Sequence, residues 1–450
     1  MRNFPWTTIC RLWALFFLAP CLGQLAASDW IPLFNGRNLE GWRAAEHPAS
    51  IQVEDGAIVC HGPRAHLFYT GPVQDAQFKN FEFIAEVRTS PGANSGIFFH
   101  TAYQESDWPA QGFEIQINNS HHGEGGYREL KKTGSLYGIR NLYRAVARDD
   151  EWFTLRLAVR ANRVTVHVNN LQTVDYVQPG SVGPEGALGR GTFALQCHDP
   201  HSRVLFRNLQ VRPLPDELPP ARVEQPVALD HYRHLLALHS GNIPVIDLHA
   251  HLKGGLTIED VLERFHRTGI NYGIAVNGGI GFPVTNDAGI YAFRKSLAGH
   301  PVFVALQAEG REWIRLFSPE AVRQFDYVFT DAMTFTDDAG RRTRLWMKDE
   351  VWVENPDAFM DMLVRRIVDI LDHEPIDIYV NATFLPDVLA ADYDRLWTPT
   401  RMDQVIDAAV RNDIAIEIND RYRIPSIDFV RRAKQKGARF TFGTNNGGRD

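Results

Sequence analysis

Hydrophobic and polar positions alternate with a period of two along residues 29 to about 213. The runs that show this alternation are FEFIAEVRT (81–89), GFEIQIN (112–118), WFTLRLAV (152–159), RVTVHVN (163–169) and VLFRNLQV (204–211). Successive side chains of a β-strand point to opposite faces, so this period predicts strands that each bury one face. Glycine, proline and asparagine separate the runs. We therefore expect an antiparallel β-sandwich or barrel.

A different pattern begins after residue 230. Short apolar runs alternate with amphipathic segments such as TIEDVLERFHR (257–267) and PDAFMDMLVRRIVDILD (356–372). The strand-like runs are NIPVIDLHAH (242–251), INYGIAVN (270–277), VFVALQAE (302–309), FDYVFTDA (325–332), IDIYVNAT (376–383), IAIEIND (414–420) and RFTFGTN (439–445). Strands that alternate with helices indicate βαβ units and a parallel sheet. We expect a distorted or incomplete (β/α) barrel, with an open doubly wound sheet as the alternative.

A proline-rich stretch, PLPDELPPARVEQP (213–226), separates the two patterns. Proline fixes φ and removes a backbone donor, so this stretch suits neither a helix nor a central strand and predicts a semi-rigid linker. The expected organisation is a signal peptide at 1–28, a sandwich at 29–213, a linker at 214–230 and a barrel at 231–450. The chain stops just after a predicted strand, so the barrel is expected to lack its closing helix.

The first 28 residues have the pattern of a secretory signal. A basic start precedes the apolar run LWALFFLAP (12–20), and the small residues LAAS (25–28) follow it. The apolar run is too short to be a stable membrane anchor. We expect cleavage near Ala27 or Ser28 and a protein that is periplasmic or secreted.

The formal charge of −7 gives no long-range attraction toward nucleic acid or anionic lipid. Beyond the signal segment only two cysteines remain, Cys60 and Cys197, both in strand-like runs. They fit buried free thiols, and a single disulfide is the alternative. The hydrophobic core must therefore hold the fold.

Polar side chains of two predicted strands are candidates for chemistry. In GFEIQI (112–117), Glu114 and Gln116 lie two residues apart and share one strand face, while the alternate residues face the core. Gln196 and His198 repeat this pattern in LQCHD (195–199). Surface decoration is the competing interpretation of such a pair.

The first half resembles the 3-keto-disaccharide hydrolase family, whose domains are concanavalin A-like jelly-roll sandwiches. The motifs that carry the resemblance occur in family order: FNGRNLEGW (34–42), TSPGANSGIFFH (89–100), GFEIQI (112–117), TGSLYGI (133–139), EWFTLRLAVRANRVTVHVNN (151–170) and LQCHDPHSRVLFRNLQV (195–211). The family pattern commonly reads LQDHG where this chain has LQCHD, so Cys197 replaces an acidic neighbour of the site.

The resemblance implies a carbohydrate substrate whose glucosyl C3 is already a ketone. Such a sugar has an acidic C2 proton, and the bond at C1 can break by elimination with acid–base help. Glu114 and His198 are the candidate acid–base pair, and either could instead serve a metal. The candidate sugar ligands are Asn94, Gln116, Tyr137, Gln196 and Arg207. Ordinary hydrolysis by two carboxylates and a non-catalytic carbohydrate-binding sandwich remain alternatives.

In the second half, His249 and His251 end an apolar strand-like run and share one strand face. Two histidines so placed at a barrel mouth are typical of metal sites in amidohydrolases and PHP-type hydrolases, which residues 244–447 resemble. The resemblance implies Glu309 and Glu417 as further ligands of a divalent metal of the zinc or manganese class. Asn381 stands where that family usually has a histidine, so a reduced metal centre, or a degenerate barrel without metal, is expected.

Together these observations predict an exported hydrolase of glycosides with a second, metal-dependent hydrolase domain. The alternative is a carbohydrate-binding sandwich attached to a metal-dependent barrel. No nucleic-acid partner is expected.

Overall fold

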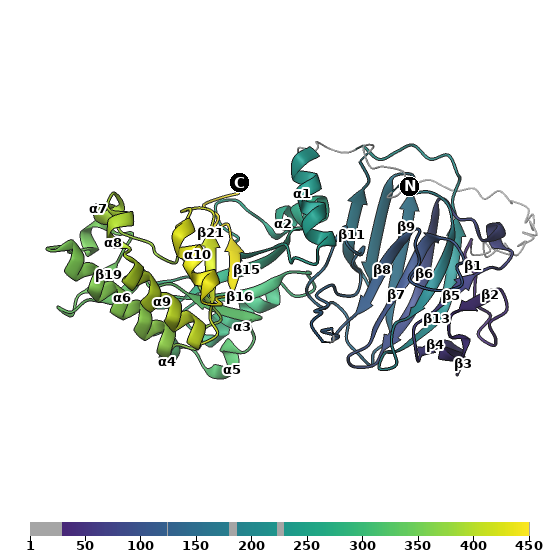
Figure 1. Ribbon diagram of the computed structural model, residues 1–450, viewed down its shortest axis with the longest axis horizontal. Coiled ribbons are helices and arrows are strands. Elements are labelled where there is room, and N and C mark those ends of the chain that lie inside the picture. The colour runs from purple at the N-terminus through teal and green to yellow at the C-terminus, as the bar shows by residue number, and fades with distance from the viewer. Residues whose placement is uncertain (1–28, 124, 180–186, 223–228, 450) are drawn as a thin grey trace, which may run out of the picture.

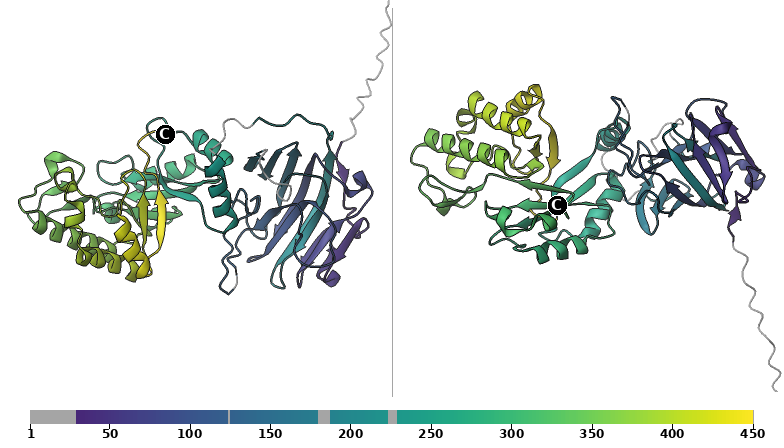
Figure 2. Two further views of the ribbon diagram at one scale, coloured as in Figure 1. Left: turned by 45° about the horizontal axis from the view of Figure 1, so that its top comes forward. Right: turned by 90° about the horizontal axis from the view of Figure 1, so that it is seen from below.

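The computed structural model describes residues 29–123, 125–179, 187–222 and 229–449. They form two domains that lie end to end, a β-sandwich and an α/β domain (Figures 1 and 2). The predicted signal peptide and residues 223–228 of the predicted linker lie outside the described residues. Helix α1 (Leu229–Ser240) already belongs to the second domain.

The first domain consists of two antiparallel sheets. The larger sheet has the order β11 (Leu171–Val177), β10 (Arg163–Val168), β9 (Phe153–Arg160), β6 (Phe81–Thr89), β13 (Arg203–Pro213), β4 (Ala57–His61) and β3 (Ile51–Glu54), with β1 (Ile31–Pro32) paired to β13. The smaller sheet has the order β2 (Trp42–Ala45), β5 (Ala65–Tyr69), β12 (Thr192–Cys197), β7 (Asn94–Thr101) and β8 (Phe113–Asn118). The prediction of an antiparallel sandwich is confirmed.

The inner faces of the two sheets pack against each other through aromatic and aliphatic side chains. Phe193 of the smaller sheet stacks on Phe83 of the larger one, with ring centroids 4.7 Å apart. On β8, Phe113, Ile115 and Ile117 belong to this core, as the alternation predicts. Both remaining cysteines are buried, free thiols within it.

Because successive side chains of a strand alternate, the residues of the smaller sheet that do not face this core point to its outer surface.

Asn169, with φ of 54°, lies in the tight turn between β10 and β11 of the larger sheet. Asparagine tolerates this left-handed conformation better than most residues do.

The second domain contains a parallel sheet of seven strands in sequence order. The strands are β14 (Ile246–Ala250), β15 (Asn271–Gly278), β16 (Phe303–Ala308), β17 (Tyr327–Thr330), β20 (Ile378–Tyr379), β21 (Ala415–Asn419) and β22 (Phe440–Gly443). A doubly wound sheet reverses its strand order at one point, and this sheet does not, so the open doubly wound alternative is wrong. A small hairpin of β18 (Thr334–Thr336) and β19 (Arg342–Arg344) is added after β17.

The end strands β14 and β22 come together without a ladder among the described residues. His249 O accepts a hydrogen bond from Asn445 N at 2.8 Å, and Asp247 accepts two from Thr444. The parallel sheet with helices is thus confirmed, whereas a closed PHP- or TIM-type barrel is not.

The helices that follow α1 are α2 (Ile258–Thr268), α3 (Asp287–Ser296), α4 (Trp313–Leu316), α5 (Pro319–Val322), α6 (Pro356–His373), α7 (Asp387–Ala390), α8 (Tyr393–Leu396), α9 (Pro399–Arg411) and α10 (Ile427–Gln435). Several of them begin at side-chain N-caps. Thr257 caps α2 in a capping box with Asp260, and Asn355 caps α6 directly before a proline. No helix of the described residues is long and apolar enough to cross a membrane.

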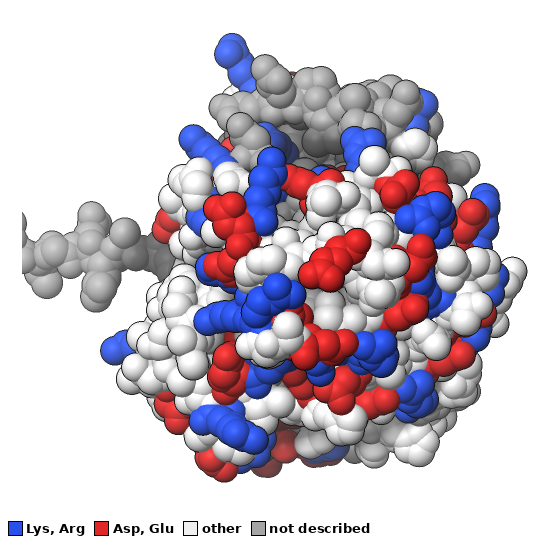
Figure 3. Space-filling model, turned by 90° about the vertical axis from the view of Figure 1, so that its left-hand side faces the viewer, with Lys and Arg blue, Asp and Glu red and all other residues white. Residues whose placement is uncertain are grey.

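The end of the second domain that lies farthest from the sandwich carries charges of both signs, interleaved over its surface (Figure 3). Many of them are paired between elements. Arg401 of α9, for example, contacts Asp361 of α6 at 2.8 Å. This end therefore presents no field of a single sign.

Candidate active site

A pocket of about 400 Å³ opens on the outer face of the smaller sheet of the sandwich. Strands β7, β8 and β12 form its floor, and the loops that flank β8 form its walls. It is lined by Asn94, Phe98, Trp108, Pro109, Glu114, Gln116, Tyr127, Glu129, Tyr137, Gln196 and His198. Six of the seven residues predicted for the sandwich site are among them.

The register of the strands explains why these residues meet. Glu114 lies opposite Phe98, and Gln116 lies opposite Gly96. Gly96 has no side chain, and a Cβ built there would lie 2.1 Å from Glu114 Oε1. The glycine therefore makes room for the carboxyl group. Gly112, directly before β8, also allows close packing. A Cβ on this residue would lie 2.3 Å from Phe99 O, so the glycine makes room for the neighbouring backbone rather than for a substrate.

Glu114 is the carboxyl group of this pocket whose pKa is shifted. Loss of hydration in the pocket floor, followed by repulsion from Glu129, raises the pKa of Glu114 from 4.5 to about 8. Gln196 Nε2 donates to Glu114 Oε1 at 3.1 Å. The carboxyl group is therefore mostly protonated at neutral pH and can act as an acid.

His198 follows the end of β12 and is held by its neighbour Asp199. Its Nδ1 lies 2.7 Å from Asp199 Oδ2, which also accepts a hydrogen bond from Ser202 Oγ. Hydrogen bonds from Ser202 and from the backbone help to keep the pKa of Asp199 below its usual value, despite its burial. Because the carboxylate fixes the proton on Nδ1, Nε2 is left as a lone-pair nitrogen. Among the described residues Nε2 has no hydrogen-bond partner.

Amide side chains complete the floor. Gln116 Nε2 donates to Asn94 Oδ1 at 3.0 Å, and both residues are almost fully buried. The backbone N–H of Asn94 donates to Ser202 Oγ at 2.8 Å. A continuous hydrogen-bonded path therefore joins Asn94, through Ser202, to the Asp199–His198 pair.

The loop between β8 and β9 supplies a wall of two tyrosines and a carboxylate. Tyr127 Oη donates to Glu129 Oε2 at 2.6 Å, and Tyr137 Oη does so at 3.3 Å. Lys131 lies beneath this wall, with Nζ 3.4 Å from Glu129 Oε1 and 4.2 Å from the centroid of the Tyr137 ring. Burial lowers the pKa of Lys131, although Glu129 opposes the shift.

Trp108, Tyr127 and Glu129 were not predicted from the sequence. Trp108 is 41% exposed, and its ring lies 5.3 Å from that of His198. An indole at the rim of a polar pocket suits stacking against a sugar ring. The loops that carry these residues have no periodicity, and only the nearness of an aromatic residue to GFEIQI in the sequence could have indicated Trp108.

The prediction that Arg207 binds the sugar is corrected by its position. Arg207 lies on β13, in the other sheet, and its Nε donates to Glu86 Oε2 at 2.6 Å. Its guanidinium covers the ring of Trp152 at 3.9 Å. The alternation of β13 turns Arg207 to the outer surface of the larger sheet, so it takes no part in the pocket.

In the second domain, His249 forms a buried pair with Glu417. Nδ1 of His249 lies 2.5 Å from Glu417 Oε1, and its Nε2 lies 3.2 Å from Gln307 Oε1. The second oxygen of Glu417 accepts hydrogen bonds from Asn381 N and Asn419 Nδ2. Both ring nitrogens of His249 are therefore already bound by protein oxygen atoms.

His251 and Glu309 directly follow the carboxyl ends of β14 and β16. Each of them already binds a protein group. His251 Nδ1 contacts Ala275 O at 3.0 Å, and Glu309 Oε1 accepts from Asn277 Nδ2 at 2.7 Å. Glu309 Oε2 is buried without a hydrogen-bond partner. Burial, then repulsion from Asp331, raises the pKa of Glu309 well above its usual value.

These four residues do not form the metal site that the sequence predicts. Within the described ranges, no three histidine, cysteine, aspartate or glutamate side chains are placed to hold one metal ion, in either domain. Amides such as those of Gln307 and Asn381 bind instead to the predicted ligands or to their neighbours, and amides are weak ligands for zinc-class metals. The residues present therefore do not fit that group.

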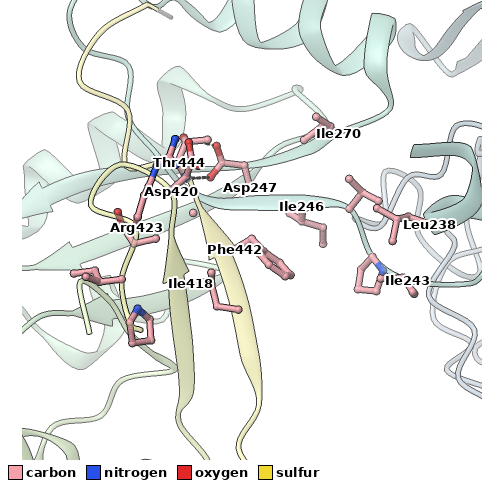
Figure 4. Close-up of a pocket in the computed structure, with 16 residues that line it drawn as sticks. Leu238, Ile243, Ile246, Asp247, Ile270, Ile418, Asp420, Arg423, Phe442 and Thr444 are labelled. Carbon is pink, nitrogen blue, oxygen red and sulfur yellow. Dashed lines mark hydrogen bonds between the residues drawn. The ribbon is translucent and has the colours of Figure 1, made fainter. Parts of the chain in front are cut away.

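A larger, mainly apolar pocket of about 740 Å³ lies where β14 and β22 meet (Figure 4). Its walls include Ile246, Ile418 and the exposed ring of Phe442. Two of the polar groups that Figure 4 shows at its edge bond to each other, since Thr444 Oγ1 donates to Asp247 Oδ2 at 2.6 Å. Among the described residues that line this pocket there is no carboxyl–histidine pair like that of the sandwich.

A known family model matches the part of the chain that contains the first pocket. Residues 29–212 match the family model described as a 3-keto-alpha-glucoside-1,2-lyase-like domain. A 3-keto-disaccharide hydrolase from Bacteroides thetaiotaomicron is 35% identical over 80 residues, which make up 16% of this chain and 28% of that protein. The chain thus matches less than a third of the length of this relative. Residues 29–212 are therefore similar to domains of the 3-keto-disaccharide hydrolase type.

Solved structures similar to the chain each cover about two fifths of it. A candidate glycosyl hydrolase from Parabacteroides distasonis is 21% identical, covers 41% of this chain and 94% of its own, and has a TM-score of 0.34. A carbohydrate-binding module from Bacillus subtilis is 11% identical, covers 38% of this chain and 93% of its own, and has a TM-score of 0.27.

Proposed function

We propose that the sandwich cleaves glycosides whose glucosyl C3 is a ketone, by elimination at C1 and C2 followed by addition of water. One observation carries the proposal: a single pocket holds a carboxyl group with a pKa of about 8 and a histidine oriented by a carboxylate. The match of residues 29–212 to a 3-keto-alpha-glucoside-1,2-lyase-like family model supports the substrate class.

His198 is the proposed base. Asp199 binds Nδ1–H, so Nε2 can take the proton from C2 of the sugar. This proton is acidic because the electron pair of the C2–H bond passes into an enolate on the C3 oxygen. The side-chain amides of Asn94 and Gln116 offer N–H groups near which such an oxygen could be stabilised.

Glu114 is the proposed acid. As the enolate collapses, a C1=C2 double bond forms, the C1–O bond breaks and the leaving oxygen takes the proton of Glu114. Water then adds to C1 and gives its proton to the Glu114 carboxylate, while C2 regains a proton from His198. The sum is hydrolysis, with both side chains returned to their starting states.

The rest of the pocket fits a sugar ring. Gln196 and Tyr137 present hydrogen-bonding groups, and Trp108 offers an aromatic face at the rim. A largely preformed pocket with a few convergent polar groups is the usual form of a small-molecule site.

The test is incubation of the purified protein with a 3-keto-disaccharide and measurement of the free sugar released. We expect release by the wild type, and a loss of roughly a hundred-fold or more in kcat for Glu114→Gln and His198→Ala, because general acid–base groups contribute about that much. Glu86→Gln is the matched control, since Glu86 lies on the other sheet and pairs with Arg207.

Binding of the sugar without turnover by the wild type would contradict the proposal and favour a carbohydrate-binding module. Equal loss of activity in Glu86→Gln would also contradict the assigned roles.

The same proposal includes export of the protein to the periplasm or beyond, which rests on the sequence pattern of residues 1–28.

No reaction is assigned to the second domain.

A further inference from the structure

We propose that Asn242 of the second domain positions the pocket wall that is formed by the loop between β8 and β9 of the sandwich. The second domain would then act on the sugar site through this loop rather than through a reaction of its own. The inference rests on the proposed function of the sandwich pocket, and it adds a positioning residue from outside that domain.

The loop between β8 and β9 lies between the pocket and the second domain. On one side it provides Tyr127, Glu129 and Tyr137 to the pocket. On the other side it contacts the end of α1 and the beginning of β15. Figure 1 shows α1 and α2 between the sandwich and the parallel sheet, next to β11. One segment thus connects the site to the neighbouring domain.

Asn242 binds this loop at two points. Its Nδ2 donates to Arg128 O at 2.6 Å, and its Oδ1 accepts from Lys131 Nζ at 2.8 Å. These two residues flank Glu129 in the sequence. Asn242 has φ of 56°, a left-handed conformation just after α1 that presents the carboxamide to the loop.

Lys131 transmits this contact to the pocket. Only 1% of its side chain is exposed, so its charge depends on protein partners. These partners are Asn242 Oδ1, the carboxylate of Glu129 and the face of the Tyr137 ring. Without the amide of Asn242 the ammonium loses a buried acceptor, and the loop has to rearrange to satisfy it.

A second clamp holds the far end of the loop. Asn271 Nδ2 donates to Asn141 O at 2.8 Å, its Oδ1 accepts from Tyr143 N at 3.2 Å, and Asn141 Nδ2 donates to His239 O at 3.0 Å. Asn141, Asn271 and His239 are buried. The interface thus consists of polar groups specific to this loop rather than of apolar packing alone.

The test uses the full chain carrying Asn242→Gly, because glycine keeps the left-handed backbone and removes only the carboxamide. The matched control is His266→Ala, which removes another contact between the domains, His266 Nε2 to Gln172 O at 3.3 Å, away from the loop. Asn242→Asp is the conservative variant, since its oxygen can still accept from Lys131.

Two readouts are measured. Hydrogen exchange of the amides of 128–137 reports the loop itself and requires no activity. The kinetics of 3-keto-disaccharide cleavage report the site. For Asn242→Gly we expect faster exchange and a fall in kcat/KM of roughly ten-fold, the size expected when a charged group loses a hydrogen bond. We expect His266→Ala to change neither, and Asn242→Asp to recover part of the loss, because its carboxylate still accepts from Lys131 but cannot donate to Arg128 O.

Unchanged exchange in Asn242→Gly would overturn the inference, and so would faster exchange with unchanged kcat/KM. Equal effects of His266→Ala would show general loosening of the interface and would also overturn it. If the wild type cleaves nothing, the proposed function fails, and the exchange data alone then decide whether Asn242 holds the loop.

Discussion

Glu114 is an acid whose properties come from its surroundings. It lies in the floor of the pocket, accepts a hydrogen bond from Gln196 and is repelled by the Glu129 carboxylate of the wall. Desolvation and repulsion both favour the neutral form, so the side chain keeps its proton at a pH where an exposed glutamate has lost it. The retained proton of Glu114 can be tested by the dependence of the rate on pH.

We predict that kcat for 3-keto-glycoside cleavage falls as the pH rises through about 8. The raised pKa means that the protonated form of Glu114, the proposed proton donor, disappears in that range. A pH–rate profile of the wild type checks this prediction. A rate that keeps rising well above this pH would contradict the role of Glu114 as the acid.

The free energy of unfolding should also depend on the ionisation of Glu114. Because the pKa of Glu114 is higher in the folded state than in the unfolded chain, the folded state binds more protons between pH 4.5 and about 8. The contribution of Glu114 to stability is complete below this window and is lost as the pH rises through it. We predict that the melting temperature of Glu114→Gln, relative to that of the wild type, rises across the window. A difference that does not depend on pH would contradict the assignment.

At the residue scale, the sequence pointed to the polar floor of the pocket but not to its walls. Glu114, Gln116 and Gln196 follow from the period of two, which places residues two apart on one strand face. Trp108 and Glu129 lie in loops, where no period constrains the direction of a side chain. Arg207 was misplaced because periodicity gives the face of a strand within its sheet but not which sheet the strand joins.

At the element scale, the strand pair β7–β8 determines where the acid can sit. Gly96 provides the space that the Glu114 carboxyl occupies. We predict that Gly96→Ala displaces this carboxyl and lowers kcat/KM by roughly a hundred-fold, which a misplacement of about 1 Å can cause. Kinetics on the folded variant provide the measurement.

Gly189→Ala serves as the control for this substitution, because a Cβ there meets only Ala187 O, at 3.9 Å. If Gly96→Ala retained full activity, the geometry assigned to Glu114 would be wrong.

The period of two indicated five strands of the sandwich, β6, β8, β9, β10 and β13, and short apolar runs indicated the seven strands of the parallel sheet. The other described strands were not predicted, for physical reasons. Strands β7 and β12 are buried at every position, so they show no alternation. Strands β18 and β19 have three residues each, too few to show a period. Strand β20 ends at Tyr379 although its apolar run continues, and Asn381 then adopts φ of 50°. The approach of the end strands β14 and β22 depends on long-range contacts such as that of Asn445 with His249, which no local pattern encodes.

At the scale of the whole molecule, we expect a substitution in the parallel sheet of the second domain to change the stability of that domain and not the activity of the sandwich. His249 and Glu417 are both about 1% exposed and pair at 2.5 Å. Removing one partner of such a pair costs about 3–5 kcal/mol. We predict that His249→Ala lowers the unfolding temperature of the second domain and leaves kcat/KM of the sandwich within two-fold, as calorimetry and kinetics can check. A large loss of cleavage activity at a temperature where the second domain is still folded would contradict this separation of the two domains.

Export can be checked on the whole chain as well. We predict that expression of the full sequence in a bacterial host yields a mature protein that begins near Ala27, Ser28 or Asp29. N-terminal sequencing of the periplasmic fraction gives the answer. Recovery of the chain with Met1 intact in the cytoplasm would contradict the prediction.

The central claim is that His198 takes a proton from C2 of a 3-keto sugar, that this proton exchanges with solvent on the imidazole, and that His198 then returns a solvent-derived proton to C2. The most direct measurement is cleavage of a 3-keto-disaccharide in D₂O, with the product examined by NMR or mass spectrometry against product kept in D₂O without protein. The account predicts one deuterium at C2 of the released 3-keto sugar in every turnover. Efficient cleavage with hydrogen retained at C2 would contradict it.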